Sequence, residues 1–329
     1  MKKLLLTLIT LTAFTVSLMA IDNNTVEIVY HGSTATVNVA ENISQYVTVS
    51  SGTSSDVRIL QDVNFEGTDI TAKNTTGEIT YVLSGISPNG SFTIEGVFKQ
   101  TIELNDLTLN NPYGPAINIQ NGKRTNLSVK SGTTNVLSDG VDTLYNGCIH
   151  CKGHLKIKGK GTLNLTGNNR HALYSKEYME VKNCTLNIES AAKDGIHCKE
   201  YFLMESGVVN IANTGDDGIQ VELSSNEKTG ITTDHEDENT GNFYMSAGTL
   251  TISSYQGKAI KADGVISYSG GTRNFPASDT EQLATIKTVK AGEVTGAQPV
   301  YNLRGIKMPA NTPLKKGSFI RKKDLIIVK

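Results

Sequence analysis

The chain has 329 residues, of which 38% are hydrophobic, and its 31 basic and 32 acidic residues give a formal net charge of -1. This balance excludes a protein that attracts nucleic acid or an anionic membrane through its overall charge, and the hydrophobic fraction excludes a disordered chain. The absence of tryptophan, the 6% of aromatic residues and the 31 glycines favour short strands joined by tight turns over long helices.

Residues 1–20 predict a secretory signal peptide. Two lysines precede an apolar run that ends at Ala20, and a polar region begins with Ile21 and Asp22. A retained membrane anchor is the alternative, but the apolar run is short for a membrane span, and no later segment is apolar enough to cross a bilayer. We therefore expect an exported protein without a membrane span after cleavage.

The segment up to about residue 109 predicts strands with loose spacing. Apolar residues alternate with polar ones, as is typical of half-buried strands, in four stretches: 47–49, 57–59, 79–83 and 102–109. We expect them to form the first, less regular coils of the fold and a cap that protects its open end.

Two kinds of position recur with the same period between residues 116 and 271. An Ile or Leu that follows a small residue recurs at steps of 32, 24, 23, 23 and 41, at Ile117, Ile149, Leu173, Ile196, Ile219 and Ile260. A glycine, replaced once by Cys184, recurs at steps of 29, 23, 23, 41 and 23. The longer steps contain polar residues and predict loops that leave the register unchanged. The acids at 234–238 predict a flexible, solvated loop, with calcium binding as the alternative.

Three short alternating stretches fit into each repeat, which excludes a helical repeat. We predict an all-β fold, a parallel β-helix with three strands and about 23 residues per coil, over residues 21–276 including the cap. Equivalent residues of successive coils then stack about 4.8 Å apart, and the apolar columns form the core. Glycine gives the backbone freedom for the corners, and Cys184 indicates a corner with negative φ.

The repeat is lost from Ala277, and residues 277–329 predict a linker and a small C-terminal β module. The tail, PVYNLRGIKMPANTPLKKGSFIRKKDLIIVK, resembles the C-terminal modules of exported Bacteroidetes proteins. This resemblance implies a role in export or surface attachment. Together with the signal peptide, it implies a protein that is secreted, at the cell surface of a Gram-negative bacterium, or in its periplasm. The alternative is a terminal hairpin that packs on the β-helix.

The four cysteines predict buried free thiols rather than a metal or redox site. Cys148 and Cys151 form a CxxC pair, but the second half of a four-ligand zinc site is missing, and no His follows Cys151. Ser175 occupies the coil between Cys151 and Cys198, so that two strand spacings separate these cysteines, beyond the reach of a disulfide.

Two columns of acidic residues are candidate metal ligands. Asp194 and Asp217 occupy equivalent positions on adjacent coils, with Asp216 beside the second, and Glu177 and Glu200 form the other column. Carboxylates stacked this closely repel each other, and calcium, which prefers carboxylate and carbonyl oxygens, would compensate. The alternatives are solvated acidic corners, or compensation by the lysine that comes next in the first column.

A row of side chains lies on the outward face of one strand of each coil, at His150, Tyr174, His197 and Gln220, and lysines flank it at Lys152, Lys176 and Lys199. Ring faces, hydrogen-bond donors and positive charge along a straight groove suit a linear, acidic polysaccharide. The predicted substrate-binding residues are therefore His150, Tyr174, Lys176, His197 and Lys199. The alternative is an ordinary exposed strand face. A second outward ladder, of structural asparagines, is predicted at Asn135, Asn164, Asn187 and Asn210.

Several of these segments resemble a known family. The stretches YVLSG, GTLNLTGNNRHALYSKEYMEVKNCTLNI, AAKDGIHCKEYFLMESGVVNIANTGDDGIQVE and MSAGTLTI are similar to the calcium-containing β-helix carbohydrate-binding family first typified by a clostridial cellulose- and pectate-binding protein. The likeness spans roughly residues 78–271. It implies a right-handed parallel β-helix with bound calcium, related in architecture to pectate-type polysaccharide lyases and binding plant-type or acidic glycans.

The resemblance also implies where calcium would bind. The acids of the family's DGI motif correspond to Asp194 and Asp217, and its SKDD position corresponds to the segments that end in Glu177 and Glu200. Glutamate replaces aspartate at both of the latter positions, and His171 stands where a further acid could occur. Fewer calcium sites are therefore implied than in the family.

Three classes of function remain open, because fold alone does not decide among them. We favour a non-catalytic polysaccharide-binding protein, acting as a monomer, since no nucleophile or acid–base set stands out. The second class is a calcium-dependent, pectate-type polysaccharide lyase, in which Arg170, Lys176 or Lys199 would remove the proton next to a uronate carboxylate. The third is a surface adhesin or structural protein, which the export signals favour.

Overall fold

The computed structural model describes residues 21–50, 54–62, 78–141, 144–225 and 238–276, together with the backbone of four strands in the C-terminal region. The predicted signal peptide and the insert acids Asp234, Glu236 and Asp237 lie outside the described residues. In the described part of the chain, no helix is long and apolar enough to span a membrane.

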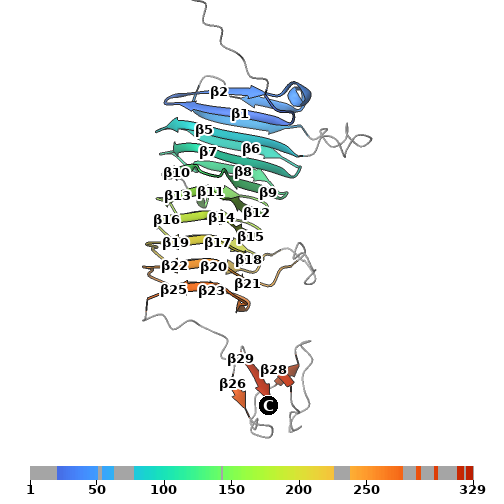
Figure 1. Ribbon diagram of the computed structural model, residues 1–329, viewed down its shortest axis with the longest axis vertical. Helices are drawn as coiled ribbons and strands as arrows, with labels where there is room; N and C mark the ends of the chain where they lie inside the picture. The colour runs from blue at the N-terminus through green and yellow to red at the C-terminus, as the bar shows by residue number, and fades with distance from the viewer. Residues whose placement is uncertain are drawn as a thin grey trace, which may run out of the picture.

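The chain begins with a less regular group of strands and one 3-10 helix, at the blue end of Figure 1. Two of its strands run antiparallel to their neighbours, β2 to β1 and β3 to β4, whereas the later strands of this stack pair in parallel. The elements of this part are β1 (Thr25–His31), β2 (Thr34–Val39), η1 (Glu41–Tyr46), β3 (Val47–Ser50), β4 (Asp56–Gln61), β5 (Ile79–Ser87), β6 (Ser91–Gly96) and β7 (Gln100–Asn110).

Eighteen strands then follow in six sets of three. Each strand of the first five sets pairs in parallel with the strand three places later in the chain. The sets are β8 (Ile117–Asn121), β9 (Thr125–Val129) and β10 (Thr134–Ser138); β11 (Gly147–Cys151), β12 (Leu155–Gly159) and β13 (Thr162–Gly167); β14 (His171–Ser175), β15 (Met179–Lys182) and β16 (Thr185–Ala191); β17 (Ile196–Lys199), β18 (Tyr201–Met204) and β19 (Val208–Ile211); β20 (Ile219–Glu222), β21 (Asn242–Met245) and β22 (Thr249–Ile252); β23 (Ile260–Ala262), β24 (Ile266–Tyr268) and β25 (Thr272–Asn274).

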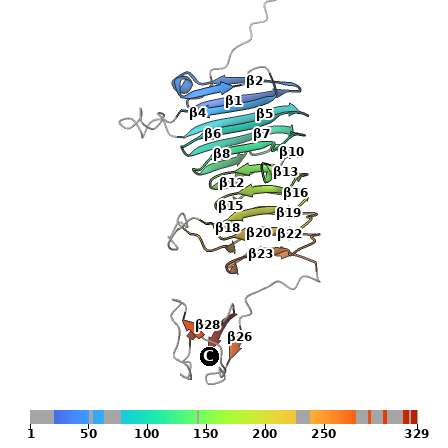
Figure 2. The same ribbon diagram turned by 180° about the vertical axis from the view of Figure 1, so that it is seen from behind.

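These strands build two long sheets that stack layer on layer in both views (Figures 1 and 2). The first strand of every set belongs to a nine-stranded sheet, and the other two belong to a 16-stranded sheet. The long strand β7 joins the two halves of the larger sheet, because its first half pairs with β9 and its last residues pair with β10. The predicted all-β fold with parallel sheets is confirmed, and the arrangement is consistent with a β-helix.

The core lies between the sheets and follows the predicted apolar columns. Leu173, Ile196 and Ile219 are Cα partners on three successive layers, and all three are fully buried. Phe202 and Phe243 continue another column, with their rings stacked at a centroid distance of 5.2 Å. Since side chains alternate between the two faces of a strand, the polar residues between these positions lie on the outer faces.

The corners follow the predicted glycine column with one exception. Gly207, Gly248 and Gly271 have φ values of +94°, +88° and +87°, a region that glycine enters readily. Cys184 is not among the residues with positive φ, as predicted, because Asn183 takes the left-handed conformation in its place with φ +64°. The exception is Gly161, which does not have a positive φ. The glycine with positive φ near this corner is Gly159, at +127°.

The predicted asparagine ladder is correct for three residues and wrong for Asn135. Asn164, Asn187 and Asn210 are Cα partners, and their side-chain amides hydrogen-bond from layer to layer at 2.8 and 2.9 Å. The Cα partner of Asn164 in the preceding layer is Val136, so the side chain of Asn135 faces inward and is fully buried. There it accepts the backbone N–H of Leu107 at 2.9 Å, a donor that would otherwise be buried without a partner.

All four cysteines are buried and free, as predicted. Ser175 lies between Cys151 and Cys198 in the sheet as the Cα partner of both, so they cannot form a disulfide. Burial raises the pKa of the Cys151 thiol to about 12, which keeps it protonated and unreactive at neutral pH.

A separate four-stranded sheet is formed by backbone from the C-terminal region, in the order β26-β29-β28-β27. Its strands are β26 (Lys287–Val289), β27 (Val300–Asn302), β28 (Gly317–Arg321) and β29 (Asp324–Val328). The remaining residues of 277–329 lie outside the described part, and the role predicted for this module in export or attachment stays a prediction.

Candidate functional site

A single row of outward side chains crosses the nine-stranded sheet from its first layers to its last. Each member is the Cα partner of the next one, on eight successive strands. The row consists of Arg58, Thr93, Asn118, His150, Tyr174, His197, Gln220 and Lys261. The structure thus brings together the four predicted residues from His150 to Gln220 and extends their alignment in both directions.

The aromatic rings of the row stack on one another instead of forming an open platform. The ring centroids of His150 and Tyr174 are 5.0 Å apart with nearly parallel planes, and those of Tyr174 and His197 are 5.5 Å apart. Only 8% of Tyr174 and 9% of His197 is exposed. The expectation that these two residues offer open ring faces to a glycan is therefore wrong, because each ring covers the next.

Two hollows lie in line along the row. The smaller, of about 190 Å³, is lined by row residues Arg58, Thr93 and Asn118 and by Tyr113 and Tyr145. Tyr113 is 77% exposed and presents an accessible ring. Neither tyrosine was predicted from the repeat, because both lie in connections outside the repeating columns. Aromatic residues in the connections next to the row were the signal that could have found them.

The larger hollow, of about 310 Å³, contains two of the three lysine and arginine residues proposed for a lyase. Arg170 lines it and donates through Nη1 to Oδ1 of Asn146 at 2.9 Å. Lys199 also lines it, with its Nζ 3.5 Å from Oε2 of Glu222. Lys176 is exposed and is not part of the lining, so the structure separates it from the other two.

The column of aspartates that repeats with the coil joins each layer to the next through backbone amides. Asp194 Oδ1 accepts the backbone N–H of Asp217 at 3.0 Å, and Asp217 Oδ1 accepts the backbone N–H of Lys258 at 2.8 Å. His171, one layer earlier, accepts the backbone N–H of Asp194 through Nδ1 at 3.2 Å. A side-chain acceptor therefore recurs at this position because a corner amide in the next layer needs a partner.

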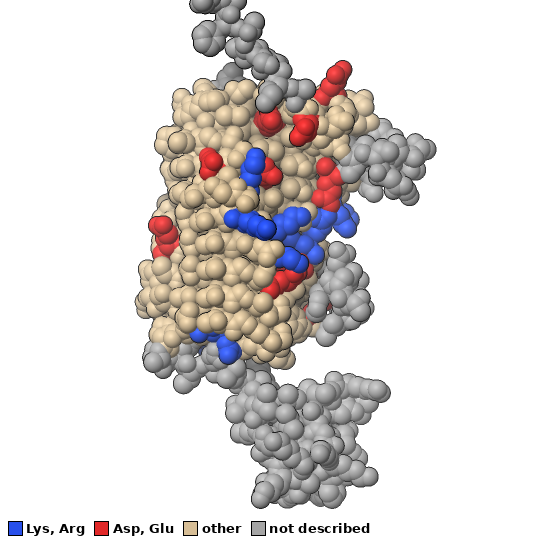
Figure 3. All heavy atoms as spheres, viewed as in Figure 1, with Lys and Arg blue, Asp and Glu red and all other residues tan. Residues whose placement is uncertain are grey.

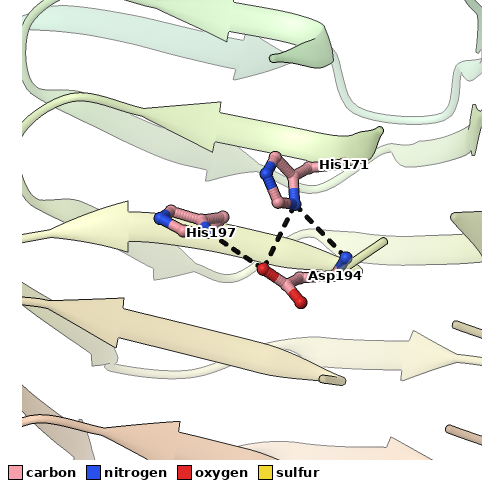
Figure 4. A group of neighbouring side chains, drawn as sticks. All are labelled: His171, Asp194 and His197. Atoms are coloured by element: carbon pink, nitrogen blue, oxygen red, sulfur yellow. Dashed lines mark hydrogen bonds and ion pairs between the residues drawn. The ribbon is translucent and has the colours of Figure 1, made fainter. Parts of the chain in front are cut away.

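The second oxygen of each aspartate lies beside nitrogen atoms. Oδ2 of Asp194 is 2.9 Å from Nδ1 of His197 and 3.2 Å from Nδ1 of His171 (Figure 4). Burial acts to raise the pKa of Asp194, but its contacts with the two histidines and with the backbone N–H of Asp217 outweigh burial and hold the pKa below its ordinary value. Oδ2 of Asp217 is 3.2 Å from the Lys261 ammonium, and burial nevertheless raises the pKa of this carboxyl.

These contacts decide whether the predicted aspartates fit calcium. Asp194, Asp216 and Asp217 do lie close enough together to share an ion. However, three of the four carboxylate oxygens of Asp194 and Asp217 already face hydrogen-bond donors or imidazole nitrogens, and the fourth faces Lys261. Calcium requires six to eight oxygen ligands, so this donor set does not fit it.

The other predicted pair lies at the far end of the same strands, and a histidine joins it. His154 Nε2 is 2.5 Å from Oε2 of Glu177 and 3.8 Å from Oε2 of Glu200. Glu200 is fully buried and has φ +68°, which few non-glycine residues adopt. His154 was not predicted from the repeat, because it lies just before β12 and outside the repeating columns.

Glu238 corrects the expectation of a solvated acidic loop at its own position. Its side chain is fully buried, and Oε1 accepts hydrogen bonds from the hydroxyl of Tyr244 at 2.7 Å and from the amide of Asn242 at 3.2 Å. This carboxylate thus belongs to a buried hydrogen-bond network rather than to the solvent.

Comparison with known proteins places these features in a family. No curated protein matches the chain significantly. A solved structure, a gadolinium derivative of the polysaccharide lyase-like protein from C. thermocellum, matches with a TM-score of 0.55 and 18% identity, covering 77% of this chain and 98% of that one, which is a likeness of fold. A family model described as carbohydrate-binding domain-containing protein matches residues 66–300. Because this match spans more than half of the chain, the protein belongs to the family of carbohydrate-binding domain-containing proteins.

Proposed function

We propose that this is an exported, non-catalytic polysaccharide-binding protein whose ligand lies along the row on the nine-stranded sheet. The observation that carries the proposal is the continuous register of the row, with two hollows in line. Its seven steps of about 4.8 Å span roughly 34 Å, a length that suits an extended polymer better than a small molecule. We also propose right-handed coils of about 23 residues, because parallel crossovers within one sheet are almost always right-handed.

The chemistry of the row suits a plant-type or acidic glycan. Tyr113 offers an exposed ring on which a sugar can stack, and the partly exposed amides of Gln120 and Gln220, which line the two hollows, offer hydrogen-bond donors and acceptors. Arg58 and Lys261 place a cation at each end of the row. A polymer that carries carboxylates would meet positive charge where it enters and where it leaves.

Replacing Tyr113 with alanine is expected to weaken polysaccharide binding about tenfold, since an accessible aromatic ring typically dominates the affinity of such a contact. The change should leave the fold intact because the ring is 77% exposed. Affinity gel electrophoresis in polygalacturonate, and separately in soluble cellulose, measures the effect.

The matched control comes from the opposite sheet, where basic side chains gather at the level of β9 and β12 (Figure 3). Lys158 of β12 is exposed and lies on the 16-stranded sheet, so Lys158→Ala removes one charge without touching the row. If Lys158→Ala weakens polysaccharide binding and Tyr113→Ala does not, the polysaccharide binds at the basic band and not along the row.

A lyase is the second candidate, because Arg170, Lys199 and His197 line one hollow. Such an enzyme removes the proton next to a uronate carboxyl, and a basic side chain in this hollow would be the acceptor. Growth of ultraviolet absorbance from unsaturated products during incubation with polygalacturonate would establish the lyase. Retention on the polymer without product supports binding alone.

The proposed calcium site consists of Glu177 and Glu200, whose carboxylates lie on adjacent layers and near each other. At calcium concentrations one hundred times the Kd, binding would add about 2.7 kcal/mol of stability. Thermal melts in calcium and in chelator should therefore differ for the parent and coincide for Glu177→Gln/Glu200→Gln. Asp216→Asn, which changes an exposed acid of the aspartate cluster, is the control. A calcium effect that vanishes with Asp216→Asn would place the ion among the aspartates.

A further inference from the structure

The floor of the larger hollow holds a compact cluster of two histidines and an aspartate. His171 begins β14, Asp194 lies just before β17, and His197 lies within β17, so two adjacent layers supply all three side chains. They are 6%, 1% and 9% exposed. Figure 4 shows both imidazole rings directed at the same carboxylate oxygen. One ligand atom from each residue lies within 4.8 Å of the other two.

The hydrogen bonds around His171 leave no proton between its ring and the carboxylate. Nδ1 accepts the backbone N–H of Asp194 at 3.2 Å, so this nitrogen carries a lone pair. The same atom is 3.2 Å from Oδ2 of Asp194, which is also an acceptor. Two acceptor atoms therefore face each other at this distance, which is an unfavourable contact. A cation between the two atoms would resolve it.

His197 presents a related conflict. Its Nδ1 is 2.9 Å from Oδ2 of Asp194, and its Nε2 is 3.4 Å from Oε2 of Glu222. A neutral imidazole has one N–H and can serve only one of these carboxylates. Histidines that ligate metals commonly donate the N–H of the other ring nitrogen to a carboxylate, which is the place that Glu222 occupies.

We propose that His171, Asp194 and His197 form a site for a divalent transition-metal ion of the zinc class, bound through Nδ1, Oδ2 and Nδ1. Two bonds of about 2.0–2.1 Å at a tetrahedral angle hold ligand atoms about 3.4 Å apart, close to the separations of 2.9 and 3.2 Å. Imidazole nitrogen suits zinc, whereas calcium prefers oxygen. The amide contact of His171 is at the long end of the hydrogen-bond range and competes only weakly with a metal bond. The hollow leaves one side of the site open to water or to a glycan oxygen.

The test is isothermal titration of the untagged, chelator-treated and dialysed protein with zinc chloride. We expect one equivalent to bind at this site, and His171→Asn/His197→Asn to weaken that binding at least 100-fold. Asparagine keeps an oxygen near the position of Nδ1, so the variant still accepts the amide of Asp194, and its melt in chelator should match that of the parent. His154→Asn, which removes an imidazole from the other cluster, is the matched control and should retain the binding.

Two further measurements test whether the site prefers a transition metal. Cobalt chloride in place of zinc should give visible absorption bands in the parent and in His154→Asn, but not in the double variant. Calcium at the same concentration should not displace the zinc. Zinc binding that survives in the double variant, disappears in His154→Asn, or yields to equimolar calcium would overturn the proposal. None of these results depends on whether the protein binds a polysaccharide.

Discussion

Replacing Asp194 and Asp217 together with alanine is expected to lower the free energy of unfolding by about 4 kcal/mol, because a buried donor that loses its partner costs about 1–3 kcal/mol. Each carboxylate accepts a backbone N–H of the following layer, at 3.0 and 2.8 Å, and both side chains are buried. The loss should be the same in calcium and in chelator, since the amide bonds need no metal. Urea unfolding followed by circular dichroism in the two buffers measures it.

The matched control replaces the same two residues with asparagine. Asparagine keeps Oδ1 as an acceptor for the amides of Asp217 and Lys258, so Asp194→Asn/Asp217→Asn should recover most of the lost stability. It also removes the negative charges that any cation would need. A loss confined to the calcium buffer, or an asparagine variant as unstable as the alanine variant, would show that the aspartates act through a bound ion.

Gly159→Ala is expected to destabilise the protein by about 3–5 kcal/mol, because it adds backbone strain to a steric clash. Gly159 has φ +127°, and a Cβ added there would lie 2.0 Å from the carbonyl oxygen of Val129 on the adjacent layer. That oxygen cannot withdraw without disturbing the parallel pairing of β12 with β9. The midpoint of urea unfolding should fall accordingly.

Gly132→Ala separates the cost of backbone strain from the cost of the steric clash. Gly132 also has a positive φ, of +78°, but an added Cβ would meet no atom within 4 Å. Its cost should therefore be the conformational strain alone, about 1–2 kcal/mol. Equal losses for the two variants would mean that the neighbouring strand yields easily and that contact between the layers is less tight than the structure indicates.

The stacking of the layers could be predicted from the sequence, because the strongest pattern in the sequence is periodic. Ile149, Leu173 and Ile196 repeat at nearly constant spacing, and only side chains stacked in columns require such spacing, so their alignment in the sheet could be predicted. The inward position of Asn135 could not be predicted. Asn164 of the next layer pairs with Val136 instead, and the buried amide of Asn135 accepts the backbone N–H of Leu107. A spacing alone does not show which of two adjacent polar residues turns inward.

The candidate site could be predicted only where it follows the columns. Alignment of His150 with Tyr174 follows from the period, but the burial of Tyr174 by its neighbours depends on how rings of different size stack. Tyr113 and His154 lie outside the repeat, and their places depend on connections whose conformation has no period. The contacts of Asp194 with two imidazoles likewise depend on which side chains surround it in the folded chain, and the acidic pattern alone did not indicate them.

The long connection between β20 and β21 has a further consequence for how such a chain can change. Ile219 and Ile260 are 41 residues apart and yet are Cα partners, just as Ile196 and Ile219 are at a separation of 23. Lengthening a connection between two fixed strands costs only about 0.6 kcal/mol for each doubling of its length. That corner is therefore a natural place for insertions, where evolution or an engineer can graft a new segment while the neighbouring layers keep their pairing.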